Sequence, residues 1–210
     1  RSLARLSLVG SPTLRLTGAM TTGDQLFQTA GGVITLLDGA AFMAGDGADI
    51  LFANNAAALG DAQATVGANG SVSFAGLLDG VGDSFKTVTL TTGSNGVVNL
   101  AQVGGPGGLG TLTVNAGTIN LGSNLTLLKD LNLTADQTLL AGDTQMSALA
   151  FRLLTDIDSA GAAASLTLED AITTLIQGRL GGNSPLSTFT SSDVGSTTLT
   201  GGVFSDGLAL

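Results

Sequence analysis

Short apolar triads, in which two apolar residues flank one polar residue, recur along almost the whole chain. This period of two, with abundant Thr, Val and Ile, is typical of β-strands. Gly, Asn, Asp and Ser separate the triads and tolerate the positive φ of tight corners. The segments are only about three to five residues long, which favours a solenoid over a sandwich. The apolar pairs include Leu6/Leu8, Leu14/Leu16, Val72/Phe74, Val88/Leu90, Val98/Leu100, Leu112/Val114, Ile119/Leu121, Leu125/Leu127, Leu131/Leu133, Leu149/Phe151 and Leu166/Leu168.

A longer period also runs through the sequence. Residues 72–90 align with 149–168, where Phe74 meets Phe151, and residues 103–121 align with 180–199. The offset stays near 77 residues, so the chain holds about two and a half copies of one unit. Each unit divides into about four coils of roughly twenty residues. We therefore expect an all-β chain folded as a parallel β-helix of about ten coils.

Residues 165–182 are the exception, because Leu168, Ile172 and Leu175 have helical spacing and Thr167 could cap a helix. The aligned stretch "VTLTTGSNGVVNLAQVGG" has the pattern of strands. We therefore favour strands over a short helix here.

Composition excludes several classes of function. Sixteen acidic residues against seven basic ones give a net charge of −9. Scattered cations do not supply the field that nucleic acids require, and an acidic surface repels anionic membranes. The chain contains no His or Cys, which removes the commonest general base and the usual zinc, haem and iron–sulfur ligands. No apolar run approaches the ~18 residues of a membrane helix.

Four stretches resemble the filamentous haemagglutinin-like repeat proteins, which are giant bacterial surface adhesins: "LTGAMTTGDQLFQTAGGVITL", "VSFAGLLDGVG", "GTLTVNAGTINLGSNLT" and "LGGNSPLSTFTSSDVGSTTLTGG". The resemblance implies a right-handed parallel β-helix, exported by a type V or two-partner route and displayed at the cell surface. It carries over no catalytic residue. The chain begins at Arg1 and ends in mid-pattern, so we expect residues 1–210 to be a single β-helical repeat segment that is part of, or processed from, a longer chain.

A glycine-rich stretch, "VGGPGGLGTLTVNAGTINLG", contains the spacing of a dinucleotide-binding fingerprint. Gly105, Gly107 and Gly110 form G-x-G-x-x-G, and Asp130 follows about twenty residues later. A nucleotide site needs a helix to begin at Gly110, whereas the residues that follow have the pattern of two strands. The aligned stretch from Gly181 keeps only part of the motif. We interpret these glycines as a solenoid corner and Asp130 as a loop carboxylate.

Two stretches resemble calcium loops. "AGDGADILF" (44–52) resembles a calcium-binding nonapeptide through Gly45, Gly47, Asp49 and Leu51, but it occurs once, whereas such sites need consecutive copies. "DIDSAG" (156–161) begins like an EF-hand loop and then lacks the oxygen ligands expected at Ala160 and Thr167. We interpret the first as a turn and the second as a solvated loop.

The sequence gives weaker support to two further functions, glycan cleavage and ice binding. A glycan-cleaving enzyme needs clustered carboxylates beside cations, and the cations of the middle and later chain are Lys86, Lys129, Arg152 and Arg179, with one Glu, Glu169. An ice-binding face needs a regular Thr array, but "TVTLTT" and "TTLTGG" do not recur at a single-coil period in the sequence. We therefore expect outward strand positions here, with no catalytic, cofactor or metal site.

The sequence thus predicts a stiff stalk or fibre segment of an extracellular bacterial surface protein, with adhesion as the purpose of the whole. The expected partners are neighbouring copies or adjoining repeats, together with surface glycans or host and abiotic surfaces. We expect neither nucleic acid nor membrane insertion. The alternatives are a subunit that polymerises end to end into a filament or sheath, and a polysaccharide-active β-helix.

Overall fold

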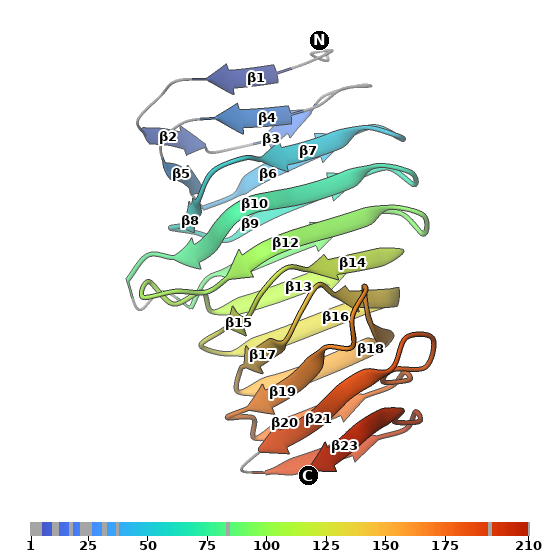
Figure 1. The fold of residues 1–210 in the computed structure, drawn as a ribbon. Helices are drawn as coiled ribbons and strands as arrows, with labels where there is room; N and C mark the ends of the chain where they lie inside the picture. The colour runs from blue at the N-terminus through green and yellow to red at the C-terminus, as the bar shows by residue number, and fades with distance from the viewer. Residues whose placement is uncertain are drawn as a thin grey trace.

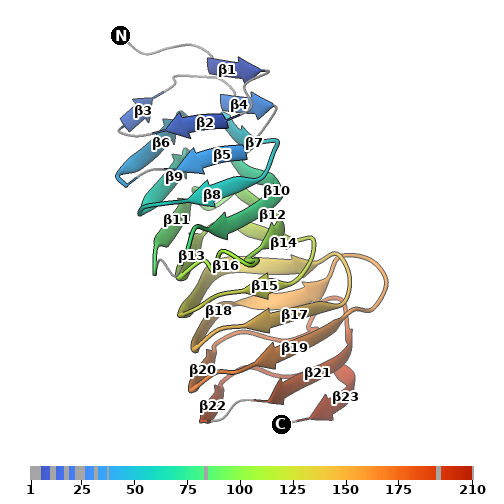
Figure 2. The ribbon, with the colours of Figure 1, turned by 90° about the vertical axis from the view of Figure 1, so that its left-hand side faces the viewer.

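The computed structural model describes residues 6–9, 13–16, 19–21, 27–30, 33–36, 38–82, 85–192 and 195–209, with the side chains of the described residues from Leu36 to Gly207. All regular structure in these residues is β, in 23 strands wound into one solenoid (Figures 1 and 2). The strands pair in parallel throughout this part of the chain, as in β13 with β16 or β18 with β20. The expectation of an all-β parallel β-helix is confirmed.

Each coil has three sides, which we call faces A, B and C in chain order. Face A contains β1 (Leu6–Val9), β4 (Phe27–Ala30), β7 (Asp49–Phe52), β14 (Thr118–Leu121), the first parts of β10 (Ser71–Gly80) and β12 (Val97–Val103), and the last parts of β16 (Asp130–Leu140) and β18 (Ala150–Ser159).

Face B contains the last parts of β10 and β12, together with β2 (Thr13–Leu16), β5 (Val33–Leu36), β8 (Ala56–Ala58), β15 (Leu125–Thr126), β17 (Thr144–Ser147), β19 (Ser165–Glu169), β21 (Leu186–Ser192) and β23 (Ser205–Ala209).

Face C contains the first parts of β16 and β18, together with β3 (Ala19–Thr21), β6 (Ala40–Ala44), β9 (Ala62–Val66), β11 (Thr87–Thr91), β13 (Thr111–Asn115), β20 (Thr173–Ile176) and β22 (Ser196–Leu199). The stacked coils are slightly fewer than the ten expected.

The coils differ in length. Ser71 pairs with Val97, 26 residues further on, whereas Thr118 pairs with Gln137, 19 residues further on. The strands themselves stay in register, so the extra residues lie at the corners. The 77-residue offset is therefore not a whole number of coils: Phe74 lies on face A, whereas the residue aligned with it, Phe151, lies on face C.

The core is a continuous column of inward side chains. Within β13, β14 and β16 the apolar triads alternate as expected, and Leu112, Ile119 and Leu133 are buried. Near the amino-terminal end the column is aromatic: the Phe52 ring stacks on Phe74 at 4.5 Å and meets Phe42 edge-on at 5.2 Å. Each such ring pair stabilises the fold by ~0.5–1.5 kcal/mol in addition to the stabilisation from the apolar area that it buries.

Residues 165–182 form strands β19 and β20, which confirms the favoured interpretation. A helix would place Leu168, Ile172 and Leu175 on one buried stripe. In the structure Leu168 is buried with Leu166, two residues away, whereas Ile172 is 57% exposed at a corner. Burial therefore follows the period of two that is typical of strands, and not the helical spacing.

Candidate functional surfaces

The glycine-rich loop lies at the corner between faces B and C, joining β12 to β13, and its amides bind an anion of the chain itself. The backbone N–H groups of Gly105 and Gly107 donate to the two oxygens of Asp79, each at 3.0 Å. Asp79 belongs to the preceding coil. Where a nucleotide site would hold a phosphate, this loop holds a carboxylate. Asp130 lies apart from it, and its interpretation as a loop carboxylate is wrong, because it is the first residue of strand β16.

Close stacking explains why this loop is rich in glycine. A Cβ atom on Gly107 would lie 2.0 Å from the carbonyl oxygen of Gly80, and one on Gly110 would lie 2.5 Å from the carbonyl carbon of Phe85. Gly104 and Gly108 have φ of +79° and +67°, which glycine adopts without strain. The loop can therefore approach the coil beneath it only because it lacks side chains.

The stretch 44–52 uses its carboxylates in the same way. Asp46 accepts the backbone N–H of Asn69 at 2.9 Å, and Asp49 accepts the backbone N–H and hydroxyl of Ser71 at 3.0 and 2.6 Å. The inward side chain is Ile50, whereas Leu51 is half-buried. These oxygens face donors of the next coil, and the described residues contain no cluster of three metal-ligating side chains.

The interpretation of residues 156–161 as a solvated loop is wrong for residues 156–159, which belong to a strand, and holds only for the exposed bend at Ala160 and Gly161. Asp156 and Asp158 belong to β18, and Asp158 is completely buried. Its carboxylate accepts hydrogen bonds from the side chains of Gln137 and Asn183 at 2.8 and 3.1 Å, and from the backbone N–H groups of Asn183 and Ser184. These donors come from the coils on both sides, and together they offset the cost of burying the charge.

Asp156 forms an ion pair with Arg179. The Arg179 backbone N–H donates to its carboxylate at 2.8 Å, and the guanidinium donates through Nε and Nη2 at 2.9 and 2.6 Å. These bonds hold the pKa of Asp156 below its ordinary value and raise the pKa of Arg179. Burial alone would raise the pKa of Asp158, but its hydrogen bonds outweigh burial and hold that pKa below its ordinary value as well. Both acids are therefore ionised near neutral pH.

These contacts follow one rule along the rod. A carboxylate or amide oxygen near a corner accepts the backbone N–H of a residue 21 to 26 positions further on, in the next coil. The acceptors are Asp38, Asp46, Asp49, Asn55, Asp61, Asp79, Asn124, Asp143, Asp156 and Asp158. We call this set the corner acceptors. It gives side-chain acceptors to backbone amides near the corners, where the strand ladders end.

Face C carries an outward array of threonines, and the expectation that the T-x-T units do not recur at one coil is wrong. Thr87 and Thr89 pair with Thr111 and Thr113, 24 residues and one coil later. Asn132 continues the row on the third coil, with its amide 3.5 Å from the Thr113 hydroxyl. The varying coil length hides this register in the sequence.

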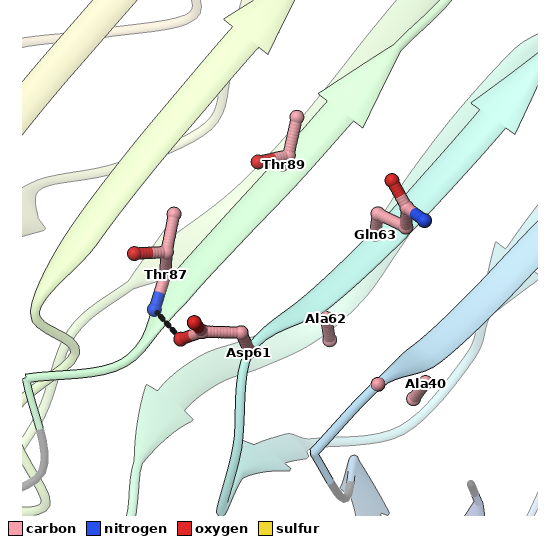
Figure 3. Close-up of a pocket in the computed structure, with 7 residues that line it drawn as sticks. Ala40, Asp61, Ala62, Gln63, Thr87 and Thr89 are labelled. Carbon is pink, nitrogen blue, oxygen red and sulfur yellow. Dashed lines mark hydrogen bonds between the residues drawn. The ribbon is translucent and has the colours of Figure 1, made fainter. Parts of the chain in front are cut away.

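A hollow of about 330 Å³ opens beside this array, lined by Gly39, Ala40, Asp61, Ala62, Gln63, Thr87 and Thr89 (Figure 3). Asp61 accepts the Thr87 backbone N–H at 2.8 Å. A second hollow of about 350 Å³ is lined by Asn124, Asp143, Thr144, Gln145, Ser165 and Thr167. In both, the carboxylate is a corner acceptor, and the linings offer hydroxyls and amides with no cation, so they suit hydrogen bonding to neutral polar groups.

No protein-family model, curated protein or solved structure matches this chain. In the part of the chain that the structure describes, no helix has the length and apolarity needed to cross a bilayer. The contacts described above are therefore the basis for assigning a function.

The expected cations are scattered over the solenoid. Lys86 and Lys129 lie at the corner between faces B and C, Arg152 lies on β18, and Arg179 lies on the coil after it. One cluster that sequence reasoning missed is Asp156, Asp158 and Arg179. The sequence does contain a signal for this cluster, because two acids at positions i and i+2 precede an arginine by one coil. The signal could not be recognised, since the length of that coil is not evident from the sequence.

Proposed function

We propose that this chain is a rigid structural segment, a stalk or fibre, of an extracellular bacterial surface protein, and that it has no enzymatic activity. The observation that supports the proposal is the set of corner acceptors. Eight of the described aspartates, which could otherwise serve as catalytic acids, bases or metal ligands, bind backbone amides of the next coil instead. Most of the described coils are thereby fastened to a neighbour at the corners as well as through the strands.

Adhesion by the whole protein follows from the same proposal. A rod of this kind holds a distal binding region away from the cell, and its neutral hydroxyl array on face C gives it lateral contact with glycans or other polar surfaces. Regular coils also resist proteases, because a protease must first pull a segment out of the ladder. End-to-end polymerisation stays a second prediction.

Labelling of cells tests the location. Antibodies raised against the purified chain should label intact, unpermeabilised cells of the source organism along thin projections. Labelling that requires permeabilisation would contradict the proposal.

Incubation of the purified chain with acidic and neutral polysaccharides tests the absence of catalysis. Viscosity and reducing ends should remain unchanged. Depolymerisation that is abolished by Asp61→Asn or Asp143→Asn would instead identify a polysaccharide-active β-helix.

A further inference from the structure

The corner between faces B and C carries a row of exposed apolar side chains on successive coils. Phe85, Leu149 and Ile172 are 59%, 45% and 57% exposed, and Leu128 is 38% exposed. Large apolar side chains that line up on an otherwise polar surface mark an interaction site more often than isolated ones do. We call Phe85, Leu128, Lys129, Leu149 and Ile172 the apolar corner.

Backbone hydrogen bonds fix the order of these residues along the rod. The N–H of Lys129 donates to the carbonyl of Gly110, that of Leu149 to Lys129, and that of Ile172 to Leu149, at 2.9, 2.6 and 2.8 Å. Gly110 in turn lies directly over Phe85, because a Cβ atom added to Gly110 would lie 2.5 Å from the Phe85 carbonyl carbon. The apolar corner therefore spans five consecutive coils, with Lys129 on the central one.

One coil before the centre, the corner residue is Gly110, which has no side chain of its own. Lys129 therefore extends across it and places its ammonium 4.2 Å from the centre of the Phe85 ring. One coil after the centre, Leu149 projects at the equivalent position. The Lys129 side chain thus covers Gly110 on one side of the central coil, and Leu149 projects at the same distance on the other side.

Charge follows the same symmetry. Two coils before the centre, Lys86 lies next to Phe85. Two coils after it, the exposed carboxylate of Asp170 lies two residues from Ile172. A two-fold axis through the central coil, perpendicular to the rod, brings Lys86 and Phe85 of one copy opposite Asp170 and Ile172 of the other. It also brings Leu149 of one copy against the Lys129 side chain that covers Gly110 in the other, and the paired charges make the surface complementary to itself.

We propose that the apolar corner is the interface of an antiparallel, two-fold symmetric dimer of this chain. The inference is independent of the proposed function, since it rests on the order of side chains along one edge. The strip is about 20 Å long, with four steps of ~4.8 Å between its five coils. A strip of this length gives an interface area at the small end of the range for protein pairs. The dimer is therefore weak and forms only at high protein concentration. It joins two rods side by side with opposite directions.

The chain contains no Cys, so a single introduced Cys reports contact without background. Leu128→Cys lies near the proposed axis and should form an intermolecular disulfide under mild oxidation at least tenfold faster than Gly142→Cys. Gly142 is an exposed position with open space around it, at a different corner, and serves as the matched control. Equal rates for the two variants would overturn the proposal.

Sedimentation equilibrium tests the charge pairing. The unmodified chain should shift from monomer to dimer as concentration rises, and Lys86→Glu should weaken the dimer at least tenfold by opposing Asp170. Adding Asp170→Asn should restore part of the loss, since Asn tolerates the φ of +68° at this position and keeps an oxygen for the Ser147 hydroxyl. A dimer unaffected by Lys86→Glu, or a monomer at all concentrations, would contradict the proposal. So would binding of the monomer to anionic vesicles through Lys86, which would identify a membrane as the partner.

Discussion

At the scale of single residues, Asp79 is the group that the amides of the glycine-rich loop bind. Its two oxygens take the amides of Gly105 and Gly107, each at 3.0 Å. The G-x-G-x-x-G spacing is visible in the sequence, and the absence of a following helix argues against a nucleotide. The carboxylate that fills the loop could not be identified, because it lies 26 residues before Gly105 and coil length varies.

The first prediction concerns this loop. Gly107→Ala should destabilise the protein by more than about 2 kcal/mol, because the new Cβ would lie 2.0 Å from the Gly80 carbonyl oxygen and force the coils apart. Gly142→Ala is the control: its Cβ meets open space, so stability should stay equal or rise by up to ~1 kcal/mol. Urea unfolding followed by circular dichroism measures both. Equal effects of the two variants would contradict the close-packing account.

The second prediction concerns pH. The folded-state pKa of Asp158 lies below its ordinary value, so its ionisation contributes stability above about pH 4 and loses that contribution as pH falls through the folded pKa. Asp158→Asn should therefore be less stable than the parent at pH 7, and the difference should shrink below about pH 4.

Thermal melts of the two proteins between pH 7 and pH 2 measure this difference. A constant difference over the whole range would show that the charge of Asp158 has no part in the stability. Asp206→Asn, a change at an exposed acid in β23 near the carboxyl-terminal end of the described chain, provides the control and should leave the melting temperature nearly unchanged.

At the scale of elements, the strands were the most predictable feature. Period-two burial places Leu112, Val114, Leu131 and Leu133 in the core as the triads indicate. Leu149 is an exception: the triad pattern pairs it with Phe151, yet it is 45% exposed because it lies at the corner before β18 and not within the strand. An apolar pattern identifies strands, but it does not separate the last corner residue from the first strand residue.

The third prediction concerns the aromatic part of the core. Phe52 contacts both Phe42 and Phe74, so Phe52→Ala should lower stability by ~3–5 kcal/mol. Phe85→Ala removes an exposed ring of the same type and should cost less than about 1 kcal/mol. Chemical denaturation measures both values. A similar loss for the two variants would contradict the assignment of Phe52 to the core.

At the scale of the whole molecule, the central claim is that stacked coils form one stiff rod, fastened at its corners. The parallel architecture was predictable from short triads and glycine-rich corners. The register between coils was not, because the spacing of residues paired between the described strands ranges from 19 to 26. In a solenoid each coil contacts only its neighbours, so strength depends on these nearest-neighbour contacts.

Pulling the chain from its two ends in a single-molecule force experiment tests this claim most directly. A rod of fastened coils should resist extension and then yield in discrete steps. Each step should release about one coil, or roughly 70 Å of chain at ~3.3 Å per residue. Asp158→Asn should lower the force of the steps near its own coil. Smooth extension at low force, without steps, would contradict the account of a rigid structural segment.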